Sequence, residues 1–243
     1  MAYNFGGKIV RDGLVMYLDA ANAKSYASGS TSWNDLTINK NNGVLTNGPI
    51  FDPANAGSIV FDAIDDQVVV PPAQSINDLP KNQITVSSWI YSMTGAPHFN
   101  RHTIAEKRSG NDGWILSVRP DLNVVRCFIL VPGWVNPTNV VEASPRNGET
   151  FFNRWNNVTM TYNNTTDRLV RIYVNGVEGI YNRQNVNPPF TQSDASANLT
   201  VGWGNFTTEF SGRISQLDIY NRVLSAQEVL QNYNAIKGRY GLP

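Results

Sequence analysis

The stretch GRISQLDIYNRVLSAQEVLQNYNAIKG, from Gly212 to Gly238, is the most informative part of the chain because it reads as one strand followed by one short helix. Ile214, Leu217 and Ile219 indicate a half-buried strand in its first part. In the second part apolar side chains recur at helical spacing, at Val229, Leu230, Tyr233 and Ile236. This spacing predicts a helix of roughly three turns with one apolar face. A lone helix closing a chain that otherwise reads as strands is typical of a small number of folds.

The start of this helix is marked by Ser225, which stands three residues before Glu228. In such a capping box the serine hydroxyl accepts the amide of the third helical residue, and the glutamate reaches back to the serine amide. We therefore expect Ser225 and Glu228 to have a structural role.

Elsewhere the apolar pattern has a period of two. Val158, Met160 and Tyr162 alternate with polar residues, which predicts a strand with one face on a core. A second alternating segment follows, and Asn175-Gly176 then forms the pair favoured in a turn that needs positive φ at both central positions. We predict a three-strand meander over residues 155–182. Further predicted strands are 15–19, 58–61, 67–70, 84–91, 103–107, 114–119, 124–131, 199–203 and 213–220. Such spacing favours an all-β sandwich of two antiparallel sheets.

Composition excludes several partners. The 243 residues contain 19 Lys plus Arg and 19 Asp plus Glu, and no block of basic residues stands out. The electrostatic footprint of a nucleic-acid binder or of a protein bound to an anionic membrane is therefore missing. No run approaches the ~20 apolar residues of a membrane span. The single Cys127 lies in an apolar run, so we interpret it as a small core residue.

The first 13 residues, MAYNFGGKIVRDG, read as an N-terminal arm that precedes one domain over residues 14–243. Their apolar run is too short for a signal peptide, so we expect the mature protein to begin near Met1. Within residues 14–243 no composition shift marks a further boundary. The tract 182–197, with Pro188-Pro189, is predicted to be a loop.

An ordered set of fragments resembles one family. These fragments are DGLVMYLDA (12–20), SIVFDAIDDQVVVP (58–71), ITVSSWIY (84–91), RWNNVTMTYNN (154–164), RIYVNGV (171–177), LTVGW (199–203) and IYNRVLSAQEV (219–229). Together they resemble the LamG-like jelly roll of the concanavalin A-like lectin/glucanase superfamily. The resemblance implies an all-β, two-sheet antiparallel jelly-roll sandwich with a concave sheet and one short C-terminal helix. The opening LDAANAKSY, followed by a W-x-D-L and a GPIFD segment, is similar to versions in tailed-phage virion proteins.

Catalysis is not indicated by the residues. Glycosidases on this fold use paired carboxylates that flank one bond. The six glutamates offer no E-x-D-x-x-E pattern; they are Glu106, Glu142, Glu149, Glu178, Glu209 and Glu228. The two histidines, His98 and His102, are expected at the surface near a strand start, and no serine sits in a nucleophile elbow. We expect no enzyme activity.

Calcium is the cofactor that the residue types best suit. Asp62, Asp65 and Asp66 cluster at a turn and offer the hard oxygen ligands that Ca²⁺ prefers. The alternative is turn chemistry, in which aspartate side chains bond nearby amides. The resemblance implies a structural calcium with an aspartate early in the closing strand. That position is Ser215 here, and Asp218 stands where relatives commonly have arginine.

Aromatic side chains offer a sugar-binding interpretation, because an exposed ring can stack on the apolar face of a pyranose. Trp134 lies in the Pro-bounded tract VPGWVNPTN and is our best candidate, with Trp114 and Trp203 near strand ends. Core positions are expected instead for the tryptophans that match the family's core, namely Trp33, Trp89 and Trp155.

The sequence is compatible with three functions. The first is a phage virion structural protein, a capsid decoration or other particle-surface protein located in the virion and held by its arm, by other virion proteins and by copies of itself. The second is a carbohydrate-binding adhesin or tail-fibre receptor-binding module. The third is a polysaccharide hydrolase, which the missing carboxylate pair disfavours. We rank the virion protein first.

Overall fold

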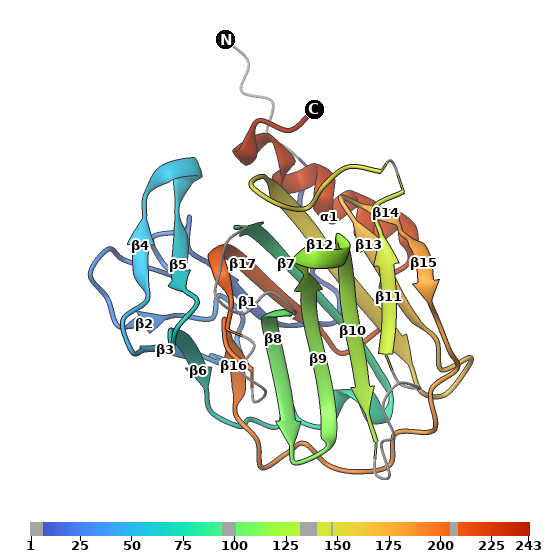
Figure 1. The fold of residues 1–243 in the computed structure, drawn as a ribbon. Helices are drawn as coiled ribbons and strands as arrows, with labels where there is room; N and C mark the ends of the chain where they lie inside the picture. The colour runs from blue at the N-terminus through green and yellow to red at the C-terminus, as the bar shows by residue number, and fades with distance from the viewer. Residues whose placement is uncertain (1–6, 94–100, 132–139, 147, 205–208) are drawn as a thin grey trace.

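The computed structural model describes residues 7–93, 101–131, 140–146, 148–204 and 209–243, which form two antiparallel sheets packed face to face (Figure 1). Sheet A has the order β14-β13-β12-β7-β17-β5-β4, and β1 also pairs with β17. Sheet B has the order β15-β11-β10-β9-β8-β16-β6-β3-β2. The predicted all-β sandwich is confirmed.

Sheet A consists of β1 (Leu14–Asp19), β4 (Ile50–Asp52), β5 (Ser58–Asp62), β7 (Gln83–Ser92), β12 (Trp155–Asn163), β13 (Val170–Val174), β14 (Val177–Glu178) and β17 (Ser211–Tyr220). Sheet B consists of β2 (Ser32–Trp33), β3 (Gly43–Thr46), β6 (Gln67–Val70), β8 (His102–Ser109), β9 (Asp112–Arg119), β10 (Val124–Leu130), β11 (Val140–Ser144), β15 (Ile180–Arg183) and β16 (Leu199–Val201). The helices are η1 (Ala54–Ala56), η2 (Leu79–Lys81), η3 (Pro120–Leu122), α1 (Ala226–Ile236) and η4 (Lys237–Tyr240).

The core lies between the two sheets and follows the pleat. In β9, for example, Trp114, Leu116 and Val118 point inward, because alternate side chains of a strand share a face. Cys127 is a free, buried cysteine of this core, as predicted. In the described part of the chain, no helix is both long and apolar enough to cross a membrane.

The closing segment forms the predicted strand and helix, but β17 is buried on both faces along most of its length and Leu230 is 41% exposed, so it does not belong to the apolar face of the helix. The Ser225 hydroxyl accepts the Glu228 amide, and the Glu228 side chain accepts the Ser225 amide, so the capping box is complete. Next to β12, β13 and β14, α1 lies over one end of sheet A (Figure 1). The short helix η4 follows α1 directly, so the two helices cover the outer face of sheet A at that end.

The predicted meander over 155–182 is only partly right. The hairpin of β12 and β13 is confirmed, and Asn175 and Gly176 both have positive φ in the turn after it. The next strand does not continue in sheet A. Residues Val177–Glu178 pair with β13, whereas Ile180–Arg183 pair with β11 of sheet B. The chain changes sheet at Gly179, where an added Cβ would come within 2.9 Å of both Ala143 and the Ser144 carbonyl oxygen.

The predicted core tryptophans are buried, but in two different layers. Trp33 lies between the sheets. Trp89 and Trp155 lie on the outer face of sheet A, where the ring of Tyr240 stacks on both at centroid distances of 4.5 Å. They therefore anchor the C-terminal segment to the sheet.

Candidate functional site

The outer face of sheet B carries one row of cross-strand neighbours. Residues that face one another in antiparallel pairs lie on the same side of a sheet. From β6 through β16, β8 and β9 to β10, this row runs through Val69, Thr200, Glu106, Ile115 and Phe128. The row changes from polar at Thr200 and Glu106 to apolar at Ile115 and Phe128.

A groove of about 250 Å³ opens at the polar end of this row, and we call it the Trp203 groove. It is lined by Gln67, Val69, Glu106, Arg108, Ala197, Asn198, Thr200 and Trp203. Its volume is below the roughly 300–1,000 Å³ of drug-sized pockets, so it suits one sugar ring rather than a long chain.

Local backbone geometry places the tryptophan in the groove. Gly202 follows β16 with a φ of 82°, and a Cβ there would meet the Phe61 ring at 2.1 Å, so only glycine fits. The hydroxyl of Thr200 lies 3.1 Å from the carbonyl oxygen of Trp203 and 3.4 Å from that of Glu106. The Trp203 side chain is partly exposed.

Arginines surround the apolar end of the row. The guanidinium groups of Arg101 and Arg126 lie over the Phe128 ring at 5.3 and 5.4 Å from its centroid. Arg126 also pairs with Glu142 at 2.7 Å. Burial, and after it the charge of Arg126, lower the pKa of Arg101 to about 10. The face therefore combines guanidinium groups, carboxylates and one open aromatic ring, which are groups that can hold polar ligands.

The three tryptophans proposed for sugar binding have different positions. Trp203 lines the groove. Trp114 is 1% exposed and belongs to the core between the sheets, so its ring cannot meet a ligand from solution. Trp114 does lie near the start of β9, as expected, but it cannot stack on a sugar because the pleat of β9 turns it inward. Trp134 lies outside the described residues.

The prediction that His102 lies at the surface is also wrong. His102 begins β8, as expected for a residue near a strand start, but it is 1% exposed. Its ring packs edge-on against Phe210. His98 lies outside the described residues.

The acidic cluster is formed as the sequence suggested. Asp62, Asp65 and Asp66 each bring a carboxylate oxygen within 4.8 Å of the others. Asp66 accepts the amide of Asp62 at 3.0 Å, so turn chemistry is present as well. Burial, with the nearby charges of Asp62 and Asp65, raises the pKa of Asp66 to about 6. Three hard oxygen donors in this arrangement fit part of the ligand set of Ca²⁺.

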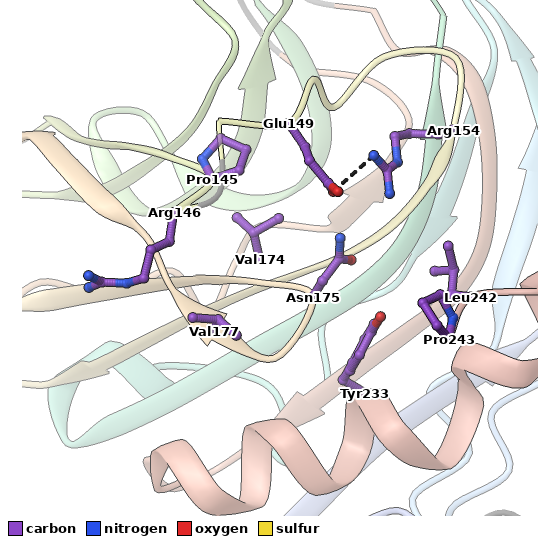
Figure 2. A pocket seen from close by; sticks show the side chains of 10 residues that line it. All are labelled: Pro145, Arg146, Glu149, Arg154, Val174, Asn175, Val177, Tyr233, Leu242 and Pro243. Atoms are coloured by element: carbon purple, nitrogen blue, oxygen red, sulfur yellow. Dashed lines mark ion pairs between the residues drawn. The ribbon is translucent and has the colours of Figure 1, made fainter.

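A second cavity, of about 360 Å³, lies between α1 and the β12–β13 side of the sandwich, and we call it the α1 pocket. Figure 2 shows Tyr233 rising from α1 toward Asn175, with Leu242 and Pro243 beside it. On the opposite wall Arg154 pairs with Glu149 at 2.9 Å. The rest of its lining is Pro145, Arg146, Val174 and Val177. The Tyr233 ring already stacks on Trp89 and lies under the ammonium group of Lys237, so these contacts compete with a ligand for its faces.

Sequence reasoning missed the arginine-covered part of sheet B. No local pattern brings Arg101 to Phe128, because Arg101 directly precedes β8, Phe128 lies in β10, and β9 stands between these two strands in the sheet. The burial of Trp114 could have been predicted from the sequence. Alternate residues of a strand share a face, so Trp114 lies on the side of the apolar Leu116 and Val118 and not on that of Ser117 and Arg119.

The fold and the groove together define a lectin-like β-sandwich, with one sheet face exposing an aromatic ring among polar groups. A family model described as the concanavalin A-like lectin/glucanases superfamily matches residues 62–230, and the chain belongs to that superfamily. No curated protein sequence matches the chain significantly.

Solved structures share the fold. The binding domain of Paraclostridial Mosquitocidal Protein 1 aligns with a TM-score of 0.70 and 17% identity over 95% of this chain and 55% of that chain. The binding domain of botulinum neurotoxin DC in complex with SialylT aligns with a TM-score of 0.69 and 15% identity over 93% and 52%. The binding domain of serotype G gives 0.64 and 16% over 90% and 50%. At such identities the likeness concerns the fold alone, and this chain spans about half the length of these relatives.

Proposed function

We propose that this chain is a non-catalytic carbohydrate-binding module that holds a sugar ring in the Trp203 groove. The observation that carries the proposal is the partly exposed indole of Trp203 beside Thr200, Asn198 and Arg108. An aromatic face supplies apolar contact area, and hydroxyl, amide and guanidinium groups fix the orientation of a polar ligand.

The carboxylate positions support a role without catalysis. The strands place Glu106 of β8 and Glu142 of β11 on the same outer face of sheet B. Three strand spacings separate them, which is about 14 Å. Glycosidase carboxylate pairs lie only about 5 to 9.5 Å apart. Glu142 is in addition held by Arg126.

The structural neighbours agree with a binding role. They are binding or receptor-binding domains, and one was solved in complex with SialylT. We carry over from them only the idea that this sandwich presents a ligand-binding face.

A glycan array with four proteins tests this function. We expect the natural chain and Trp203→Phe to bind the same glycan, and Trp203→Ala to lose the signal. Arg154→Ala, in the α1 pocket, is the matched control and should bind normally. Far-UV circular dichroism of each variant verifies folding. Loss of binding in Arg154→Ala with retention in Trp203→Ala would move the site to the α1 pocket, and absence of any signal would refute the proposal.

A second candidate function is favoured by the opening of the sequence. The segments LDAANAKSY and GPIFD resemble tailed-phage virion proteins, so we propose that the module is displayed on a virion, on the capsid or tail, next to other virion proteins and copies of itself. Labelled antibody against the chain should decorate purified particles. Particles without label would remove this context and leave the glycan proposal intact.

We also propose that calcium occupies the acidic cluster of Asp62, Asp65 and Asp66. The mutual repulsion that contributes to the raised pKa of Asp66 is a cost that a divalent cation would relieve. In this proposal the ion has a structural role at the end of β5.

A further inference from the structure

Lys107 and Asp194 form a fully buried pair between a strand and a loop. Lys107 belongs to β8, and Asp194 lies in the tract between β15 and β16. Both side chains are 0% exposed, and Lys107 Nζ lies 3.5 Å from Asp194 Oδ1. That distance is longer than a normal N–H···O hydrogen bond, and it brings the amine against the carboxyl group.

The other contacts of Lys107 fix the orientation of its amine. Nζ donates to the carbonyl oxygen of Asp194 at 2.7 Å and to that of Ala197 at 2.8 Å. Two hydrogens of a tetrahedral nitrogen are therefore directed at backbone oxygens. The remaining substituent position, which is a lone pair in the neutral amine, is left for the Asp194 carboxyl group.

The two oxygens of the Asp194 carboxyl group differ in their surroundings. Oδ1 accepts the backbone amide of Asp78 at 2.7 Å. Oδ2 is buried and has no hydrogen-bond partner among the described residues. An amide donor on one oxygen polarises the carbonyl as an oxyanion hole does. The unpartnered oxygen then matches a protonated, neutral hydroxyl.

We propose that Lys107 and Asp194 condense to form an intramolecular amide cross-link. The neutral amine of Lys107 attacks Cγ of the protonated Asp194 side chain, forming the Nζ–Cγ bond while Oδ1 takes up negative charge facing the Asp78 amide. The Cγ–Oδ2 bond then breaks. Oδ2 leaves as water with the acid proton and one proton from Nζ, so no oxidant, reductant or co-reactant is needed.

The surroundings favour the neutral forms that react. Burial lowers the pKa of Lys107 and raises the pKa of Asp194. Moving one proton from the ammonium to the carboxylate removes two buried charges, which low-dielectric surroundings penalise. The exposed pair Lys81–Asp78 provides the contrast, because its atoms lie only 2.9 Å apart but its side chains are 37% and 29% exposed. Water keeps that pair charged, and we expect no cross-link there.

The cross-link would join a central strand of sheet B to the tract that leads into β16 and the Trp203 groove. It would close a covalent loop from residue 107 to residue 194, which restricts the unfolded chain as a disulfide does. A chain with one reduced cysteine would thereby gain a covalent staple that does not depend on redox conditions.

Intact-mass spectrometry of the purified, denatured full-length chain tests the proposal. We expect the natural chain to be lighter than its sequence mass by one water. Lys107→Arg and Asp194→Ala should each have their full sequence mass, and Lys81→Arg should still be one water lighter. Fragmentation of a protease digest should show the peptides of Lys107 and Asp194 joined.

Each other result overturns the proposal. A natural chain of full mass would show a plain buried ion pair. A lost water that persists in Lys107→Arg would show a succinimide at an aspartate and no cross-link. The mass of the natural chain decides the question even where a variant fails to fold, and it is independent of glycan binding.

Discussion

Arg239 donates two hydrogen bonds to Asp19, at 2.8 and 3.1 Å, and so joins the segment after α1 to the first strand of the chain. Asp19 is almost fully buried, and Tyr17 donates a third hydrogen bond to it at 3.0 Å. The pair holds η4 over the outer face of sheet A, where Tyr240 stacks on Trp89 and Trp155.

Arg239→Ala should therefore cost much of the stability of the chain. The substitution leaves a buried carboxylate without its cation, which typically costs about 3–5 kcal/mol. The free energy of unfolding, measured with urea, checks this value. Arg119→Ala is the matched control, because Arg119 pairs with Asp121 nearer the surface. Its loss should be at most about 1 kcal/mol, and equal losses in the two variants would contradict our account.

The buried Asp218 should make the folded chain less stable as pH rises. Its side chain faces Asp19 and Tyr17, with Gln216 donating to both its oxygens at 3.1 and 2.8 Å and the charges of Arg11 and Arg239 nearby. Burial raises the pKa of Asp218 to about 8 from 3.8. The folded state keeps a proton that the unfolded state releases, so this group lowers stability as pH rises from about 4 to about 8.

Asp218→Asn should remove that dependence. Relative to the natural chain, the variant should gain stability with rising pH, by at most about 1.4 kcal/mol per pH unit, because one pKa unit corresponds to that energy. Urea unfolding at pH 5, 6, 7 and 8 measures the slope. A constant difference between the two proteins across this range would show that Asp218 is ionised in the folded state.

Part of this architecture was accessible from the sequence and part was not. The capping box at Ser225 and the turn at Asn175-Gly176 are local, so residue types and spacing sufficed to predict them. The change of sheet at Gly179 depends on the approach of β11, which lies some 35 residues away in sequence, and no local pattern encodes it. The burial of Lys107 could not be predicted from the sequence for the same reason. It stands between Glu106 and Arg108 in a charged run, and only the pairing of β8 with β9 turns it into the core.

The candidate site, like the fold, could be predicted from the sequence only in part. Of the three tryptophans named from the sequence, Trp203 lines a groove and Trp114 does not, because the pleat decides which face a strand residue occupies. The polar partners of Trp203 come from β6, β8 and β16, which meet only in the folded sheet.

Calcium binding should raise the melting temperature. With calcium in large excess over its dissociation constant, about 100-fold, the folded state gains about 2.7 kcal/mol. Thermal unfolding with calcium chloride, with magnesium chloride and with a chelator measures the effect. Asp62→Asn should abolish it, whereas Asp52→Asn, which alters the Arg213 pair away from the cluster, should not. Because the pKa of Asp66 is about 6, the effect should weaken at pH 5. Identical melting temperatures in all three solutions would remove calcium from the cluster.

The contacts of the N-terminal residues allow a test that distinguishes a loss of association with partners from a loss of folding. The Val10 amide donates to Asn232 at 2.8 Å, and the Val10 carbonyl oxygen accepts the Tyr220 hydroxyl at 3.0 Å. Val10 also packs in the small cluster of Tyr173, Tyr220, Leu224 and Val229. Residues 8–10 are thus part of the domain that α1 completes, although the sequence suggested an arm over residues 1–13.

Deletion of residues 1–12 should lower the melting temperature, whereas deletion of residues 1–6 keeps the contacts of Val10 and should leave the domain folded. The longer deletion exposes the apolar cluster and removes two buried hydrogen bonds, which together cost about 2–4 kcal/mol. If residues 1–6 contact other virion proteins, the shorter deletion should already prevent incorporation into particles, although the isolated domain stays folded. Incorporation that fails only in the longer deletion would be explained by loss of folding, and the arm would then have no part in assembly.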